Sequence, residues 1–347
     1  MRFIIFLITY LTLSTLALAQ DDFLAKQYFE DGDFEKAVVF YEKLVDKNPR
    51  RTEYVQQLVS CYQQLERYNE AEVFLNQRLK DRNPYPTLLI DLGYNYALQE
   101  KTELAQKNYD KALDIIDKNP NYGYALGLQF QKYNLLNMAI KAFQKSMKLN
   151  PALNFNFQLA RIYGEQGNVE AMYNSYLNLV IDGKTSKSNI LRSIDDFVSE
   201  DPENKNNSLL KKVLLERAQK NPDILWNELL SWLFIKQNQF SSAFRQEKAI
   251  FKRMNGSSTT RLVNLGQSAL ENEAYEIAKD IYSYIIANTS DKIVQLDAEL
   301  NLIDIDLVNA TGNKLDAIEK KYEELVDIYG YKSQTLQLQV AYANSNL

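Results

Sequence analysis

The chain has 347 residues, contains no histidine and has one cysteine, Cys61. The missing histidine excludes His-based acid–base catalysis, Ser-His-Asp and Cys-His nucleophilic systems, and nearly all zinc sites. The formal net charge of -5, without blocks of like charge, excludes the basic stripe that nucleic-acid binding requires. A lone cysteine cannot form an internal disulfide, and the apolar pattern around Cys61 predicts a buried, small hydrophobic side chain.

Residues 1–19 have the pattern of an export signal. Arg2 and the amino terminus give a positive start, residues 3–13 are mostly apolar, and Ala17-Leu18-Ala19 fits the small-x-small rule for cleavage. We therefore predict a signal peptide over 1–19 and a periplasmic protein, or a secreted one if a second export step exists. No membrane span is expected after cleavage. An uncleaved anchor is the alternative, although the apolar run is somewhat short for a full span.

Four alanines at equal spacing mark the most regular stretch of the mature chain. Each has a bulky residue four positions later and a leucine thirteen positions earlier. A fixed period of about 34 residues is the signature of stacked helical hairpins. The alanines are Ala37, Ala71, Ala105 and Ala139; the bulky residues are Tyr41, Leu75, Tyr109 and Phe143; the leucines are Leu24, Leu58, Leu92 and Leu126.

The first unit, residues 23–49, shows how each hairpin is expected to form. Leu24, Ala25 and Tyr28 fall on one face of a first helix, helix A. Gly32 is placed to end that helix, because glycine tolerates positive φ. A second helix, helix B, is predicted from Phe34 until Asn48-Pro49, where the proline disfavours helix in the residue before it. The small alanine lets helices A and B approach closely, and the aromatic residue fills the space beside it.

The repeated positions resemble those of the tetratricopeptide repeat family, over at least residues 23–151. The third unit has Leu92-Gly93, Tyr96, Ala105, Tyr109, Ala112 and Pro120, and the fourth has Leu126-Gly127, Phe130, Ala139, Phe143 and Pro151. These stand where the family keeps Leu-Gly, Tyr, Ala, Phe, Ala and Pro. The resemblance implies an all-α fold, a right-handed α-solenoid of about nine antiparallel helix pairs with a concave inner surface.

The pattern loosens after residue 151, which suggests four segments. We expect a signal peptide at 1–19, an N-terminal repeat array at 20–183, a divergent helical pair at 184–222, and a C-terminal array at 223–347. In the fifth unit Met172 occupies the alanine position, which predicts a slightly wider helix pair. Later in the chain, Glu247 replaces the usual aromatic residue.

The end of the chain is expected to hold an unfinished repeat. A ninth hairpin is predicted over 293–308 and 314–328. Residues 333–347 then begin a further helix A, and no polar capping helix follows, although solenoids normally need one. Either the final helix caps the stack itself, or the natural chain continues or meets a partner there.

The resemblance also implies which residues line the concave surface, namely helix A positions outside the packing set. Gln56, Ile90 and Glu228 are among these positions, and a Lys/Asn clamp for terminal carboxylates is absent from them. Large aromatic side chains suit a polypeptide-binding groove; the alternative is that they fill gaps between neighbouring helices A. The candidate groove residues are Phe29, Gln63, Tyr94, Tyr124, Leu128, Phe157, Arg161 and Trp232.

No pattern indicates catalysis, a metal site or a cofactor. Carboxylate pairs such as Asp195-Asp196 and Asp304/Asp306 fit solvated helix faces better than a hydrolase site, and no glycine-rich phosphate loop occurs. We expect a non-catalytic scaffold or adaptor of the cell envelope, with protein or peptide partners and no nucleic acid. The alternatives are a sensory or substrate-presenting part of a longer enzyme or signalling protein, and a groove that binds carbohydrate.

Overall fold

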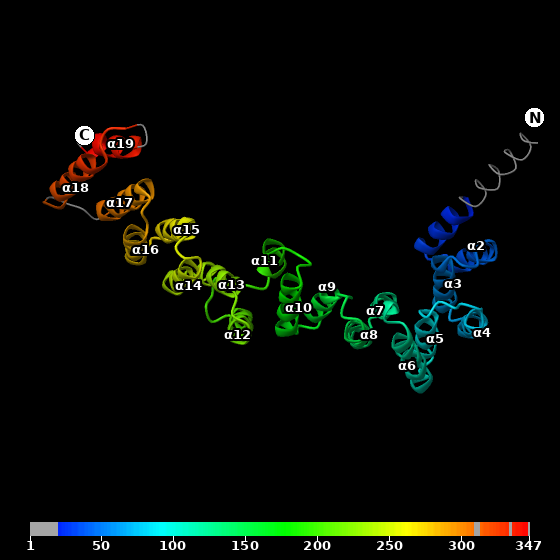
Figure 1. The fold of residues 1–347 in the computed structure, drawn as a ribbon. Helices are drawn as coiled ribbons and strands as arrows, with labels where there is room; N and C mark the ends of the chain where they lie inside the picture. Colours follow the sequence, from blue (N-terminus) through cyan, green and yellow to red (C-terminus); the bar gives the residue numbers. More distant parts are fainter. Residues whose placement is uncertain (1–19, 309–312, 333–334, 346–347) are drawn as a thin grey trace, which may run out of the picture. The chain divides into compact units, whose positions relative to one another are not determined.

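The protein is described by a computed structural model that covers residues 20–308, 313–332 and 335–345. Within these ranges the secondary structure consists of helices joined by turns and short loops, with no strand (Figure 1). Nine successive helix pairs and a final helix follow one another along the described chain. The all-α fold is therefore confirmed. The expected signal segment, residues 1–19, lies outside the described residues.

The first of two compact units ends at Ile162. Residues 20–30 form its first helix, and a 3₁₀ turn, Pro120–Tyr122, precedes α7. The other helices are α2 (Phe34–Lys47), α3 (Thr52–Gln64), α4 (Tyr68–Arg78), α5 (Leu88–Ala97), α6 (Thr102–Lys118), α7 (Gly123–Lys132), α8 (Leu136–Leu149) and α9 (Asn156–Glu165), which continues past the boundary.

The second unit begins at Tyr163. The sequence-based boundaries after residues 183 and 222 both lie inside it. Its helices are α10 (Val169–Ile181), α11 (Lys187–Asp195), α12 (Lys205–Lys220), α13 (Ile224–Lys236), α14 (Phe240–Arg253), α15 (Thr260–Glu271), α16 (Tyr275–Asn288), α17 (Lys292–Leu307), α18 (Asn313–Tyr329) and α19 (Leu336–Ser345).

The helices of a regular hairpin pack through a glycine on helix A and an aromatic ring on helix B. The four repeat alanines are buried, and α5 packs on α6 as α7 packs on α8. A Cβ atom placed on Gly93 would lie 2.4 Å from the Tyr109 ring, and one on Gly127 would lie 2.4 Å from the Phe143 ring. The glycine of each Leu-Gly pair therefore makes room for the bulky residue of its partner helix.

The turn between helices A and B uses the left-handed backbone region in each of the first four units. Gly32 has φ +76°, as its sequence position predicts, and the residues at the equivalent position of the next three units adopt the same region. These are Glu66 (φ 57°), Glu100 (φ 60°) and Asn134 (φ 56°). Non-glycine residues carry a steric cost in this region, so the packing of the hairpin must offset that cost at these three positions.

The divergent segment holds two helices, α11 and α12, which both pack against α10. Only Ile190 and Ile194 of α11 are buried. Ion pairs attach it to α13: Lys187 contacts Glu228, and Asp195 lies 2.8 Å from Lys236. Electrostatic contacts thus supplement a small apolar interface.

The last hairpin encloses its own core. Helices α17 and α18 correspond to the pair predicted at 293–308 and 314–328, and the turn expected between them falls largely outside the described residues. Leu338 of α19 is fully buried against this core. Its other buried members are Leu296, Leu300, Ile303, Ile318, Tyr322, Leu325 and Val326.

Candidate functional site

Two neighbouring helices A of the first unit, α7 and α9, carry large apolar side chains on their surface. Tyr124 and Leu128 are one turn apart on α7 and are 46% and 40% exposed. Phe157, which is 48% exposed, lies one turn from Arg161 on α9. The Tyr124 ring lies 5.9 Å from that of Phe155, the residue just before α9, which connects α7 to the start of α9. Four of the sequence-predicted groove residues therefore lie on two successive helices A, and we call Tyr124, Leu128, Phe157 and Arg161 the α7–α9 patch.

The charge of the α7–α9 patch comes from Arg161. Its guanidinium group is exposed and has no ion pair or hydrogen bond within the described part of the chain. The patch thus offers three large apolar side chains beside one unpaired cation.

The other predicted groove residues have packing roles or lie elsewhere. Tyr94 stacks on Tyr133 with ring centroids 4.0 Å apart, so one of its faces is covered. Phe29 makes edge contacts with two other aromatic rings of the first hairpin. Gln63 is only 7% exposed and offers little surface. Trp232 is half-buried on α13 of the second unit.

Sequence reasoning missed a polar network that connects three successive helices A. The buried Asp91 of α5 accepts hydrogen bonds from Gln129 of α7 and, at 2.6 Å, from the Tyr133 hydroxyl. Gln56 of α3 donates to Gln129 at 3.1 Å and so joins α3 to α7, the helices on either side of α5. Ile90 of α5, expected on the concave surface, is instead fully buried. Contacts between neighbouring helices A therefore bury residues that were expected on the concave surface.

The charge of the Asp91 carboxylate is only partly compensated. Burial raises its pKa to about 6, although the hydrogen bonds from Tyr133 and Gln129 and the charge of Lys132 oppose the shift. Within the described residues its Oδ2 atom has no hydrogen-bond donor, and neither has Oδ1 of the buried Asn95, one turn further along α5. The signal in the sequence was an acidic residue inside the apolar run of residues 88–92.

A second network occupies the irregular unit where Glu247 replaces an aromatic residue. Glu247 is 3% exposed, and Arg261 binds both of its carboxylate oxygens at 2.7 Å. Ser231 stands where other units have the helix A glycine and donates to Glu247. Glu228 accepts from Arg261 and from Lys187. The hydrogen bonds to Glu247 are the main reason that the Arg261 pKa is raised. Polar contacts here substitute for the glycine–aromatic pair.

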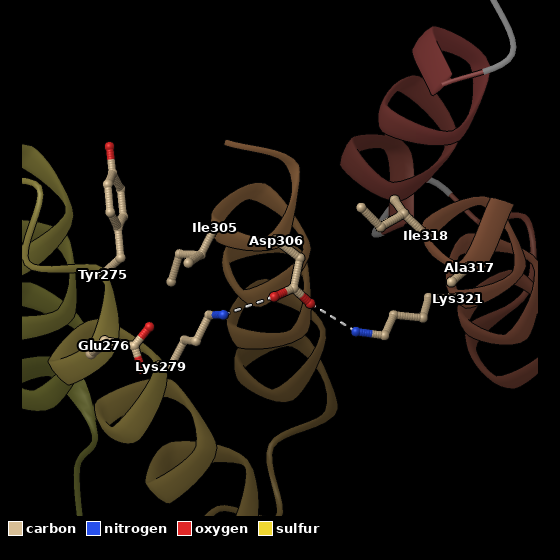
Figure 2. Close-up of a pocket in the computed structure, with 8 residues that line it drawn as sticks. All are labelled: Tyr275, Glu276, Lys279, Ile305, Asp306, Ala317, Ile318 and Lys321. Carbon is tan, nitrogen blue, oxygen red and sulfur yellow. Dashed lines mark hydrogen bonds and ion pairs between the residues drawn. The ribbon is translucent and has the colours of Figure 1, made fainter. Parts of the chain in front are cut away.

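Three other titratable groups that the sequence singled out are Cys61, Asp304 and Asp306. Within the described residues, no group of three or more histidine, cysteine or acidic side chains could hold a metal ion. Cys61 is free and fully buried, as predicted, and burial raises its thiol pKa to about 12. Asp306 is held between Lys321 and Lys279, which lower its pKa (Figure 2). Partial desolvation instead raises the pKa of Asp304, so the two carboxylates do not act as a matched pair.

Comparisons with known proteins agree with a helical-hairpin repeat protein, the class that this architecture defines. Residues 28–87 match the family model of the tetratricopeptide repeat. This match and the repeating hairpins show that the chain contains tetratricopeptide repeats. No helix in the described residues has the length and apolar character needed to cross a membrane.

Curated relatives and solved structures give more distant similarities. The human protein O-mannosyl-transferase TMTC1 is 25% identical over 178 residues, which are 49% of this chain and 20% of that protein. The general transcriptional corepressor trfA of Dictyostelium discoideum is 24% identical over 121 residues, 34% of this chain and 9% of its own length. This chain therefore spans a fifth or less of both. A solved tetratricopeptide repeat protein from Parabacteroides merdae is 14% identical, with a TM-score of 0.27 over 83% of this chain and 99% of that one.

Proposed function

We propose that this protein is a non-catalytic scaffold that binds a polypeptide segment of another protein on the α7–α9 patch. The observation that carries the proposal is the exposure of Tyr124, Leu128 and Phe157, between 40% and 48%, on two neighbouring helices A. Large apolar side chains gathered on a surface mark protein–protein contact sites. Aromatic residues are also enriched among the residues that dominate binding energy.

The chemistry of the patch favours a particular kind of segment. Apolar side chains of the partner would cover the Tyr124 and Phe157 rings, and a carboxylate would pair with Arg161. Because an exposed ion pair contributes little to affinity, the apolar contacts supply most of the binding energy. Arg161 helps to fix the position of the bound segment along the patch.

We place the scaffold in the cell envelope after export. This part of the proposal is supported by the signal-like pattern of residues 1–19. Expression of the full chain with a C-terminal tag, followed by cell fractionation and mass determination of the mature protein, tests it. Cleavage after Ala19 and recovery from the periplasm are expected; a full-length protein in the cytoplasm contradicts it.

A matched pair of leucine substitutions tests the binding surface. Leu128, on α7, is 40% exposed. Leu104, on α6, which is helix B of the preceding hairpin, is 43% exposed. The tagged mature protein is used to capture partners from envelope extracts, and the Leu128→Ala and Leu104→Ala variants are compared with it. A specific partner whose capture falls at least tenfold with Leu128→Ala, and stays unchanged with Leu104→Ala, supports the proposal.

Equal capture by both variants contradicts the α7–α9 patch as the binding surface. Circular dichroism and thermal unfolding of each variant show whether the helices remain intact, so a folding defect is recognised separately. The exposed positions of both leucines favour unchanged folding.

A further inference from the structure

The second unit has a hollow of about 380 Å³ between α15, α17 and α19. It lies against two helices A, α15 and α17, and the helix that follows the last hairpin. It shares no residue with the α7–α9 patch. The described residues that line it are Thr259, Thr260, Val263, Ile293, Val294, Leu296, Asp297 and Gln337.

The wall of this hollow, which we call the Asp297 hollow, is half aliphatic. Val263 and Val294 are half-buried, and Ile293 is 45% exposed although it is a large hydrophobic residue. Threonine hydroxyl groups and the Gln337 amide supply polar contacts. Such a mixture of apolar surface with a few polar groups is typical of a ligand pocket.

Asp297 gives the hollow its charge. It is half-buried, and no cation or hydrogen-bond donor contacts its carboxylate within the described residues. Two other carboxylates of the second unit are paired: the half-buried Glu228 contacts Lys187 and Arg261, and the buried Glu247 contacts Arg261. Asp297, which is half-buried, keeps part of its contact with water and lacks the cationic partner that these two have.

A second hollow of nearly the same size holds a carboxylate that is paired with lysines of the protein itself. It has a volume of about 370 Å³ and lies between α16, α17 and α18. Figure 2 shows Asp306 in this hollow between Lys279 and Lys321, at 3.0 Å and 2.9 Å. None of the described residues that line the Asp297 hollow is basic, so its carboxylate is available to pair with a cation of a ligand.

We propose that the Asp297 hollow binds a polypeptide segment in which a lysine or arginine lies beside an aliphatic residue. The cationic side chain pairs with Asp297, and the aliphatic side chain packs against Ile293 and Val263. The inference rests on the proposed scaffold function and deepens it, because it adds a second contact with its own ligand chemistry. A basic ligand also suits the second unit as a whole, whose acidic residues outnumber its basic ones.

The test is selection of a random heptapeptide library, displayed on phage, against the full mature protein. Peptides that pair Lys or Arg with Leu, Ile or Val are expected, and their affinity is then measured by fluorescence anisotropy. Asp297→Asn should weaken binding at least tenfold, and Ile293→Ser should weaken it by a similar factor. Asp316→Asn removes an exposed acid on α18 of the same unit and should leave affinity unchanged.

Peptides without a cation, or peptides that bind the Asp297→Asn variant as tightly as wild type, overturn the inference. Failure here is distinguishable from failure of the scaffold proposal. Peptides lost with Leu128→Ala but retained with Asp297→Asn support the α7–α9 patch and overturn the Asp297 site. A selection that yields no Asp297-dependent peptide counts as the overturning result, provided that the variant's circular dichroism and melting temperature match those of wild type.

Discussion

At the scale of single residues, Glu66, Glu100 and Asn134 hold a left-handed backbone conformation that suits glycine. The buried carboxylate of Asp91 has an oxygen without a donor among the described residues. Both features cost free energy of folding, because one imposes a steric penalty on the backbone and the other removes a charge from water. A single substitution can relieve each of them.

Glu100→Gly is expected to stabilise the protein. A left-handed residue with a side chain costs about 1–2 kcal/mol, while glycine costs about 0.5–1 kcal/mol in unfolded-state entropy. The net gain in the free energy of unfolding should therefore be up to about 1.5 kcal/mol, measured by urea denaturation. Gly32→Ala makes the reverse change at φ +76° and should destabilise by about 1 kcal/mol. A loss of stability in Glu100→Gly contradicts this account.

Asp91→Asn is expected to change how stability depends on pH. Because the folded-state pKa of Asp91, about 6, lies above its unfolded value near 3.8, its contribution is complete below pH 4 and is lost as the pH rises through 6. At about 1.4 kcal/mol per pKa unit, the ionised carboxylate costs about 3 kcal/mol. The amide oxygen can accept from Gln129 and Tyr133 as Oδ1 does, and the substitution removes the buried charge.

Urea denaturation of wild type and Asp91→Asn at pH 4.5 and 7.5 measures this effect. The variant's advantage over wild type should be larger at pH 7.5 by about 1–3 kcal/mol. An advantage of the same size at both values would show that Asp91 titrates normally in the folded protein.

At the scale of elements, the repeat shows two ways to join helix A to helix B. In the regular hairpins a glycine meets an aromatic ring, as Gly266 meets Tyr282 between α15 and α16. In α13 and α14, Ser231 meets Glu247, and Arg261 of α15 completes the contact. The second arrangement depends on a buried charge that must remain paired.

Glu247→Ala is expected to destabilise the protein by about 2–3 kcal/mol. Breaking a buried ion pair costs about 3–5 kcal/mol when the remaining charge is uncompensated, and here Arg261 keeps its contact with Glu228. The double substitution Ser231→Gly/Glu247→Tyr restores the glycine–aromatic pair and should cost much less than Glu247→Ala. Thermal and urea unfolding of both variants provide the comparison. If the double variant loses as much stability as Glu247→Ala, the two arrangements are not interchangeable.

At the scale of the whole molecule, the chain consists of two compact units built from sequential hairpins. In such a repeat array each hairpin contacts its neighbours, so stability is approximately a sum of local terms. Disturbance at one hairpin should therefore weaken with distance along the chain.

Gly127→Val and Gly266→Val test this locality by hydrogen exchange. The new side chains would collide with the rings of Phe143 and Tyr282, since even a Cβ atom would lie 2.4 Å and 2.8 Å from them. Gly127→Val should speed exchange in α7 and α8 and leave α15 and α16 unchanged, and Gly266→Val should do the opposite. Faster exchange across both units in either variant would indicate global coupling.

The sequence by itself determined the fold class, because local periodicity specifies helical hairpins. Gly32, Ala37 and Tyr41 predict the turn and the packing of the first unit, and equivalent positions recur at the same spacing in the next three units. The helix A positions also indicated the four side chains of the α7–α9 patch.

Only the tertiary structure decided which of the other helix A positions are covered. It buried Ile90, and it brought Gln56 to Gln129 across α5. It also placed Asp297 in a half-aliphatic hollow whose described lining residues include no cation. These properties depend on contacts between residues far apart in the sequence and on the charges that neighbouring helices bring together, and a local pattern carries no record of either.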